Sequence, residues 1–286
     1  MLQAKFYETY YFCNIVHNVL RDQFSYIRMI NEFYCDDQIF YLAAPFEKYS
    51  AFHYFIEFIV EDVYLEEAFE ADIDEIKGLN STHEAVREYY DLSKLPIEKA
   101  FDFHRIDYQS FHSHLLDSGK SISNFDVNDI DSYIEEIRLS QSYEDLTKQT
   151  VKEIFHVLFQ NRQLMLSFNE MMARSLELSS DQIVDEGIKH QFTRPGILKR
   201  QTIPKWVQRA VFFRDRGRCV LCDKDLSGTL NIDNLENYDH IVPLAKNGFN
   251  DVSNIQLLCR ECNQEKRDGS AITSSSYQTW YPYNEI

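Results

Sequence analysis

Near the C-terminus the sequence contains Cys219-Val-Leu-Cys222, Asp239-His240-Ile241, Asn254 and Cys259-Arg-Glu-Cys262-Asn263, and this pattern specifies the fold of that region. Two Cys-x-x-Cys pairs, separated by 36 residues, flank the Asp-His dipeptide. Each pair supplies two thiolates, and two pairs brought together make the tetrahedral four-sulfur site that structural zinc prefers. We therefore expect Cys219, Cys222, Cys259 and Cys262 to bind one zinc ion.

The expected zinc site is structural. Four protein ligands fill the tetrahedral coordination of zinc and leave no open position for water. A redox dithiol is the alternative for a Cys-x-x-Cys pair, but it needs an activated pair on a thioredoxin-like framework, and nothing upstream of either pair has that pattern. Any catalysis must therefore come from other residues.

Length and charge indicate two parts with different roles. A chain of 286 residues exceeds the usual size of one domain. Residues 191–286 hold 13 basic and 11 acidic side chains, which leaves 16 basic and 35 acidic side chains in residues 1–190. The overall charge of −17 would argue against nucleic acid if it were uniform, but the asymmetry makes that average misleading.

Residues 1–190 are expected to form an acidic, all-helical domain. Glycine is sparse there, and apolar residues recur every three or four positions, as in Phe52, Phe55, Ile56, Ile59 and Val63. Its acidic surface is either an ordinary solvated helix surface, a shield over the basic C-terminal part, or an interface for a homodimer or a partner protein.

The sequence favours a cytoplasmic protein that does not enter a membrane. The first residues lack the basic start, apolar core and cleavage site of a secretory signal, and no apolar run approaches membrane-spanning length. The remaining cysteines, Cys13 and Cys35, stand alone among aromatic and apolar residues, as small buried thiols often do.

A basic segment follows the acidic part. Residues 191–203 are expected to be a linker, and Pro204 and Gly217 frame one helix. Eight basic residues and a single acid lie between Arg194 and Arg218, so we expect one helix face to meet phosphate. The predicted nucleic-acid contacts are Lys199, Arg200, Lys205, Arg209, Arg214, Arg216 and Arg218.

Residues of about 200–270 resemble the HNH, or ββα-metal, endonuclease family. The family pattern is Cys-x-x-Cys, Asp-His-Ile-x-Pro, a glycine-bearing turn, Asn-hydrophobic-x-x-Leu-Cys and Cys-Asn-x-x-Lys, and each part is present in order. The resemblance implies a mainly α fold, in which the all-α helical domain precedes a small zinc-stabilised ββα-metal module. We place this nuclease domain at residues 204–272 and a C-terminal tail at 273–286.

The resemblance also implies the roles of the site residues. His240 is expected to be the general base, since an imidazole removes a proton from water near pH 7. Asp239 and Asn263 occupy the positions that hold a catalytic Mg²⁺ or Mn²⁺ in similar proteins, and both of these ions prefer oxygen ligands. Asn254 is expected to brace the loop and orient the histidine. Lys266 either stabilises the phosphate or is a solvated helix residue.

The expected activity is therefore metal-dependent endonucleolytic hydrolysis of phosphodiester bonds, in DNA rather than RNA by analogy with most similar modules. RNA stays open because the sequence shows only charge directed at phosphate. A role in bacterial or phage defence rests on family habit alone. The competing interpretation is an inactive, zinc-scaffolded protein that binds nucleic acid or acts as an adaptor.

Overall fold

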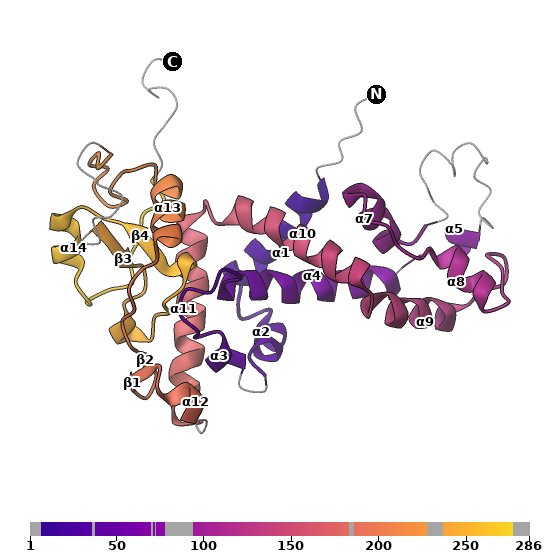
Figure 1. Ribbon diagram of the computed structural model, residues 1–286, viewed down its shortest axis with the longest axis horizontal. Coiled ribbons are helices and arrows are strands. Elements are labelled where there is room, and N and C mark those ends of the chain that lie inside the picture. The colour runs from indigo at the N-terminus through magenta and orange to yellow at the C-terminus, as the bar shows by residue number, and fades with distance from the viewer. Residues whose placement is uncertain are drawn as a thin grey trace, which may run out of the picture. The chain divides into compact units, whose positions relative to one another are not determined.

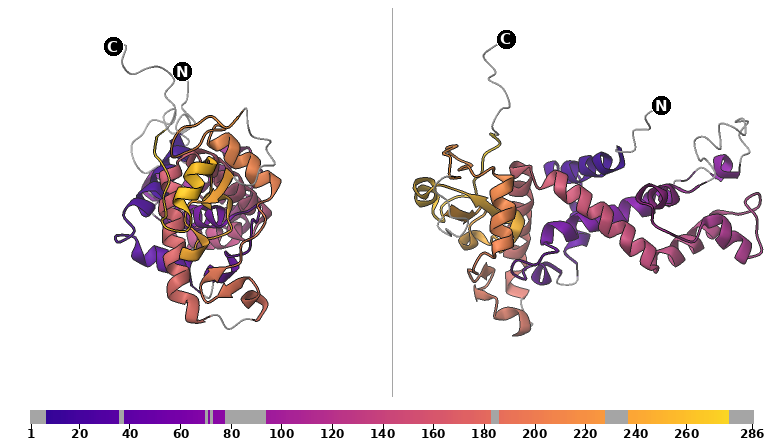
Figure 2. Two further views of the ribbon diagram at one scale, coloured as in Figure 1. Left: turned by 90° about the vertical axis from the view of Figure 1, so that its left-hand side faces the viewer. Right: turned by 45° about the horizontal axis from the view of Figure 1, so that its top comes forward.

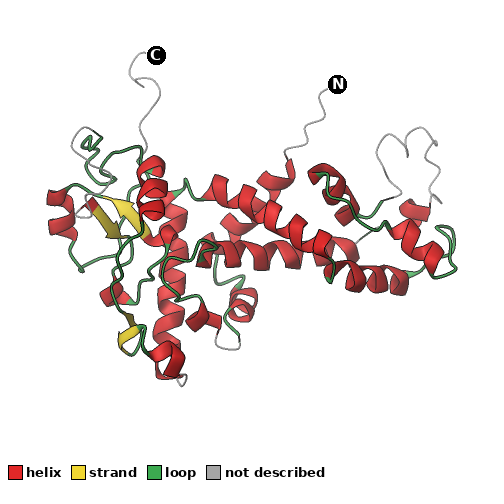
Figure 3. Cartoon of the chain, viewed as in Figure 1, coloured by secondary structure: helices red, strands yellow, loops and turns green. Residues whose placement is uncertain are grey.

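The computed structural model describes residues 7–35, 38–69, 71, 73–77, 94–182, 186–227 and 237–276. Helices dominate these residues, and the strands form two small two-stranded sheets (Figure 3). The expected mainly α fold is thus confirmed. The chain divides into a first unit, residues 1–12 with 56–154, and a second unit, residues 13–55 with 155–286. The boundary at residue 190 between independent domains stays a prediction.

The described residues of the first unit form helices joined by turns and loops. A buried carboxylate, that of Glu98, joins two of its helices by accepting the backbone N–H of Leu95 and that of Phe111, each at 2.9 Å. These bonds supply the partners that a buried carboxylate requires. Its helices are α5 (Ile73–Lys77), α7 (Pro96–His104), α8 (Phe111–Asp117), α9 (Val127–Arg138) and parts of α1 (Tyr7–Arg21), α4 (Ala51–Phe69) and α10 (Gln141–Leu158).

The second unit contains the C-terminal part and several helices from earlier in the chain. Helix α11 (Arg162–Ser179) packs against the 3₁₀ turn η4 (Val252–Asn254), and Asn169 Nδ2 donates to Ser253 Oγ at 3.0 Å. Figures 1 and 2 show α11 beside the strands and helices of the C-terminal part. This unit also contains α2 (Ile27–Phe33), α3 (Gln38–Tyr41), α12 (Glu186–Lys189) and α13 (Lys205–Arg214), with the 3₁₀ turn η1 (Ser180–Gln182).

The expected two strands and helix are present in the second unit. Strands β3 (Tyr238–His240) and β4 (Ile255–Leu257) are antiparallel, with His240 opposite Ile255, and α14 (Arg260–Lys266) follows β4 directly. The connection after β3 contains the 3₁₀ turn η3 (Leu244–Lys246). Later in this connection, a Cβ on Gly248 would lie 2.0 Å from Val242 O, so position 248 requires glycine.

A second antiparallel pair, β1 (Phe192–Arg194) and β2 (Ile197–Leu198), lies within the segment expected to be a linker. The helix expected after Pro204 is observed as α13. Its C-cap, Asp215, is buried and accepts the Leu257 N–H at 2.9 Å, while Arg162 Nη1 from α11 approaches the same carboxylate at 3.6 Å. This carboxylate therefore joins α13, β4 and α11.

No helix in the described ranges combines the length and the apolar character needed to cross a membrane.

Candidate metal centre and active site

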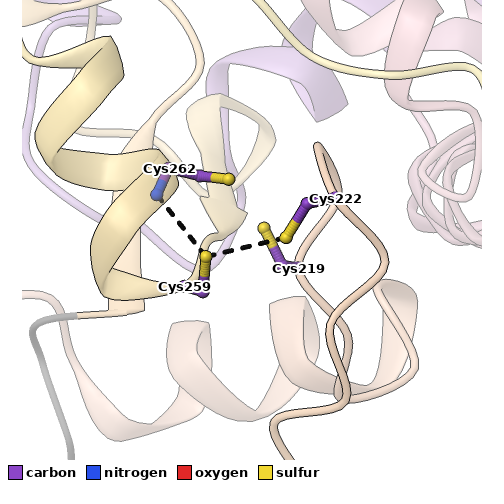
Figure 4. Close-up of side chains that lie close together, drawn as sticks. All are labelled: Cys219, Cys222, Cys259 and Cys262. Carbon is purple, nitrogen blue, oxygen red and sulfur yellow. Dashed lines mark hydrogen bonds between the residues drawn. The ribbon is translucent and has the colours of Figure 1, made fainter.

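The four cysteines come from two turns that meet in space. Cys219 and Cys222 lie in the loop after α13, where the Cys219 N–H donates to Lys224 O at 3.0 Å. Cys259 caps α14, and its Sγ accepts the Cys262 N–H at 3.4 Å. Figure 4 shows the four side chains gathered at one point, and all four Sγ atoms lie within 4.8 Å of one another. They are positioned to bind a metal ion.

The sulfur spacing suits a zinc-sized ion. Zn–S bonds of about 2.3 Å place the sulfurs of a tetrahedral site about 3.8 Å apart. The Sγ atoms of Cys222 and Cys259 are 3.7 Å apart. Burial raises the pKa of the Cys259 thiol to about 11, and a divalent cation would offset that effect because it stabilises thiolate.

A separate cavity of about 760 Å³ lies beside β3. It brings together three residues that the sequence singled out, Asp239, His240 and Asn263, with the β1–β2 hairpin on its wall. Its lining is Thr193, Arg194, Ile197, Leu198, Arg200, Tyr238, Asp239, His240, Pro243, Leu244, Ala245, Asn263, Arg267 and Asp268.

His240 is almost fully enclosed, with 1% of its surface exposed. Its Nε2 lies 3.3 Å from Asn250 Oδ1, whereas its Nδ1 has no hydrogen-bond partner among the described residues. Burial, reinforced by the positive charges of Arg200 and Lys266, lowers the pKa of His240 to about 3. The imidazole is therefore neutral at pH 7.

Asp239 is held by a lysine from the end of α14. Lys266 Nζ lies 2.8 Å from Asp239 Oδ2 and 2.7 Å from His240 O, and 1% of the lysine side chain is exposed. The alternative of a solvated helix position for Lys266 is therefore wrong. Asn263, one turn earlier on α14, is half-buried in the cavity wall.

Asn254 makes three hydrogen bonds to the backbone of the segment between β3 and β4. Its Oδ1 accepts the Val242 N–H at 2.8 Å, and its Nδ2 donates to Val242 O at 3.0 Å and to Phe249 O at 2.9 Å. These bonds use both amide hydrogens. The hydrogen bond to the His240 ring comes from Asn250 instead, so any orienting effect of Asn254 acts through the backbone.

The predicted phosphate-facing residues lie in different surroundings. Arg200 lines the cavity, and Lys199, Lys205, Arg209 and Arg216 are exposed elsewhere. Arg218 is half-buried and pairs with Asp223 at 3.3 Å.

Arg214 corrects the prediction of a nucleic-acid contact. Its side chain is 0% exposed, because its Nε and Nη2 bond Asp215 at 2.8 and 2.9 Å and Nη2 also bonds Ile255 O at 2.6 Å. The run of basic residues in the sequence gave no indication that one of them lies on the buried face of α13.

Three site residues were missed by the sequence reasoning. Arg194 and Arg267 line the cavity, and Asn250 contacts His240. The Pro195-Gly196 dipeptide, flanked by apolar Phe192 and Ile197, is a turn signal that indicates the β1–β2 hairpin and hence Arg194. For the other two we find no comparable signal, because their roles depend on folding.

The fold and the site define a ββα module with four cysteines positioned to bind a metal ion and a separate cavity that contains a histidine. Residues 219–269 match the HNH endonuclease family, which confirms the resemblance for this part of the chain. The match includes all four cysteines together with Asp239, His240 and Asn263. Comparisons with curated proteins and with solved structures gave no match.

Proposed function

We propose that this protein is a metal-dependent endonuclease that hydrolyses phosphodiester bonds in DNA. One observation carries the proposal: within the HNH segment, a single cavity is lined by a neutral histidine, a carboxylate and an amide, with three arginines around them. These groups supply a base, oxygen ligands for a cation and positive charge for phosphate.

His240 is the proposed general base. Its buried Nδ1 meets no hydrogen-bond partner within the part of the chain that the structure describes, and a buried acceptor without one is satisfied most simply by a water molecule. A water at this atom would give its proton to the imidazole as its oxygen attacks phosphorus. The ring is neutral at pH 7, so its lone pair is available for that proton, and the negative charge of a bound phosphate would raise the lowered pKa of the imidazole.

Asp239 and Asn263 are the proposed holders of a divalent cation. One carboxylate and one amide oxygen in the same cavity wall fit a hard ion such as Mg²⁺ or Mn²⁺, with water and phosphate as further ligands. Lys266 Nζ donates a hydrogen bond to Asp239 Oδ2, which leaves Oδ1 as the carboxylate oxygen available to an ion. When bound, such an ion neutralises the charge that builds on the leaving oxygen.

Three arginines in the cavity wall suit a nucleic-acid backbone. Arg194 from the hairpin, Arg200 after it and Arg267 after α14 are exposed and line the same cavity. Guanidinium groups bind phosphate in a bidentate manner but carry no sequence information by themselves. We therefore propose backbone recognition with low sequence specificity.

The four-cysteine centre is the proposed structural zinc site. It lies at the start of α14, the helix that also carries Asn263 and Lys266. A closed sulfur site of this kind stabilises a small module rather than catalysing a reaction. Two metals with different roles would thus serve one module.

The test is cleavage of plasmid DNA, single-stranded DNA and RNA by zinc-loaded, full-length protein, with Mg²⁺, with Mn²⁺ and without added metal. His240→Ala should lower the rate by about 10²- to 10⁴-fold, the usual contribution of a general base. His112→Ala is the matched control, because His112 is an exposed residue of α8.

Equal cleavage by wild type and His240→Ala would contradict the proposed base. Binding of nucleic acid without cleavage under every metal condition would favour the adaptor interpretation. Cleavage of RNA alone would change the substrate class while retaining the chemistry.

A further inference from the structure

We infer that Asn250 is a positioning residue that selects the tautomer of His240, so that Nδ1 is the basic nitrogen. This inference rests on the proposed function of His240 as a base. It assigns to Asn250 a role distinct from that of Asn254, whose amide contacts only backbone atoms in its hydrogen bonds described above.

The orientation of the Asn250 amide follows from its second contact. Its Nδ2 donates to Lys199 O at 2.9 Å, and a carbonyl oxygen only accepts hydrogen bonds. The other end of the amide, Oδ1, therefore faces His240 Nε2 at 3.3 Å. Two amide orientations are otherwise hard to distinguish, and here the backbone carbonyl decides between them.

The amide orientation determines which ring nitrogen carries the proton. Asn250 Oδ1 has no hydrogen to donate, so His240 Nε2 must be the N–H group of this bond. In a neutral imidazole, the proton on Nε2 leaves the lone pair on Nδ1. This is the nitrogen that has no partner among the described residues.

The backbone around Asn250 is held by a segment about 200 residues earlier in the chain. Asn250 O accepts the Phe46 N–H at 2.8 Å, and Asp251 Oδ2 accepts the Ala51 N–H, at the start of α4, at 2.9 Å. On the other side, Asn254 Nδ2 donates to Phe249 O. Asn250 is thus fixed at both flanks, which limits the positions that its amide can adopt.

The test compares two substitutions at one position. Asn250→Leu removes both polar contacts at similar volume, whereas Asn250→Asp retains an acceptor for His240 and loses the donor to Lys199 O. We expect Asn250→Leu to lower kcat by about 10- to 100-fold, as loss of an orienting partner does elsewhere, with little change in KM. Asn250→Asp should retain most of the activity.

A matched control comes from the same loop. Asn247 Nδ2 donates to Gly196 O at 2.9 Å, a similar amide-to-backbone bond, and its φ of 61° suits glycine. Asn247→Gly keeps this backbone conformation but removes the amide hydrogen bond, so stability should fall while kcat stays unchanged. Wild-type kcat in Asn250→Leu, or equal losses in Asn250→Leu and Asn250→Asp, would overturn the inference.

A spectroscopic readout separates this inference from the proposed function. The ¹⁵N shifts of the His240 ring should show the Nε2–H tautomer in the wild type and a mixture of tautomers in Asn250→Leu. An Nδ1–H tautomer in the wild type would overturn the inference. Because this measurement needs no activity, it still decides the role of Asn250 if the protein cleaves no nucleic acid.

Discussion

The buried pair between Lys266 and Asp239 gives the sharpest prediction. Lys266→Met retains most of the lysine's apolar stem and removes its ammonium group. That group lies 2.8 Å from Asp239 Oδ2 and 2.7 Å from His240 O. The substitution leaves a carboxylate in the cavity wall without its positive partner.

The expected loss of stability follows from the burial of both side chains. Removing one partner of a buried ion pair typically costs 3–5 kcal/mol, because the remaining charge is uncompensated. The Asp239 side chain is 10% exposed and faces the cavity, where water can solvate it in part. We therefore expect a cost at the lower end, about 3 kcal/mol.

A divalent cation should reverse much of this loss. Urea unfolding would be measured on zinc-loaded, full-length protein without added Mn²⁺ and then with Mn²⁺. An ion present at about 100 times its Kd stabilises the folded state by about 2.7 kcal/mol. In Lys266→Met the ion restores a partner to a carboxylate that has none, so Mn²⁺ should stabilise this variant more than the wild type.

The control is an exposed pair of the same chemistry. Lys224 Nζ lies 3.3 Å from Glu261 Oε2, and the two side chains are 56% and 65% exposed. Lys224→Met should leave stability nearly unchanged, because solvent screens such a pair. The reasoning would be refuted if Lys266→Met were as stable as Lys224→Met without Mn²⁺, or if Mn²⁺ stabilised wild type and Lys266→Met equally.

Two further predictions concern the metal centre and pH. Cys219→Ser should lose zinc and unfold the module, whereas His240→Ala should retain both the zinc and the fold. Elemental analysis with circular dichroism tests this prediction, and a folded, zinc-loaded Cys219→Ser protein would contradict it. Burial, with a contribution from the charge of His156, lowers the pKa of His53 from 6.5 to about 4, and its Nδ1 accepts the Ser50 N–H at 3.1 Å. Protonation therefore favours the unfolded chain, and stability should fall by up to about 3 kcal/mol from this group as the pH drops from 6.5 to 4. Urea unfolding across this range should show a smaller fall for His53→Gln, and an equal fall would refute the assignment.

Local spacing in the sequence was enough to predict the metal centre and the order of the module. Two Cys-x-x-Cys pairs place four sulfurs correctly because each pair spans one turn, and the turns meet when β4 leads into α14. The order of Asp239, His240 and Asn263 likewise predicted residues that share one cavity. Their catalytic roles, the substrate, and any shielding by the acidic N-terminal part remain predictions.

Contacts between distant segments could not be read from the sequence. The proposed partner of His240, Asn250, depends on Lys199 and Phe46, and the cap of α4 by Asp251 joins positions 200 residues apart. The burial of Arg214 is a similar case, because the face of α13 on which it lies is set by packing against β4.

The amino-acid sequence alone was thus sufficient to predict the four cysteines that are positioned to bind a metal ion and the family of residues 219–269, because the decisive residues are close in sequence and have few possible arrangements. Three properties became known only from the folded structure: which basic residues line the cavity, the pairing of Lys266 with Asp239, and which side chain contacts the His240 ring. Those properties depend on burial and on hydrogen bonds across long sequence separations, and they arise only once α11, α13 and the segment at 46–51 pack around the module.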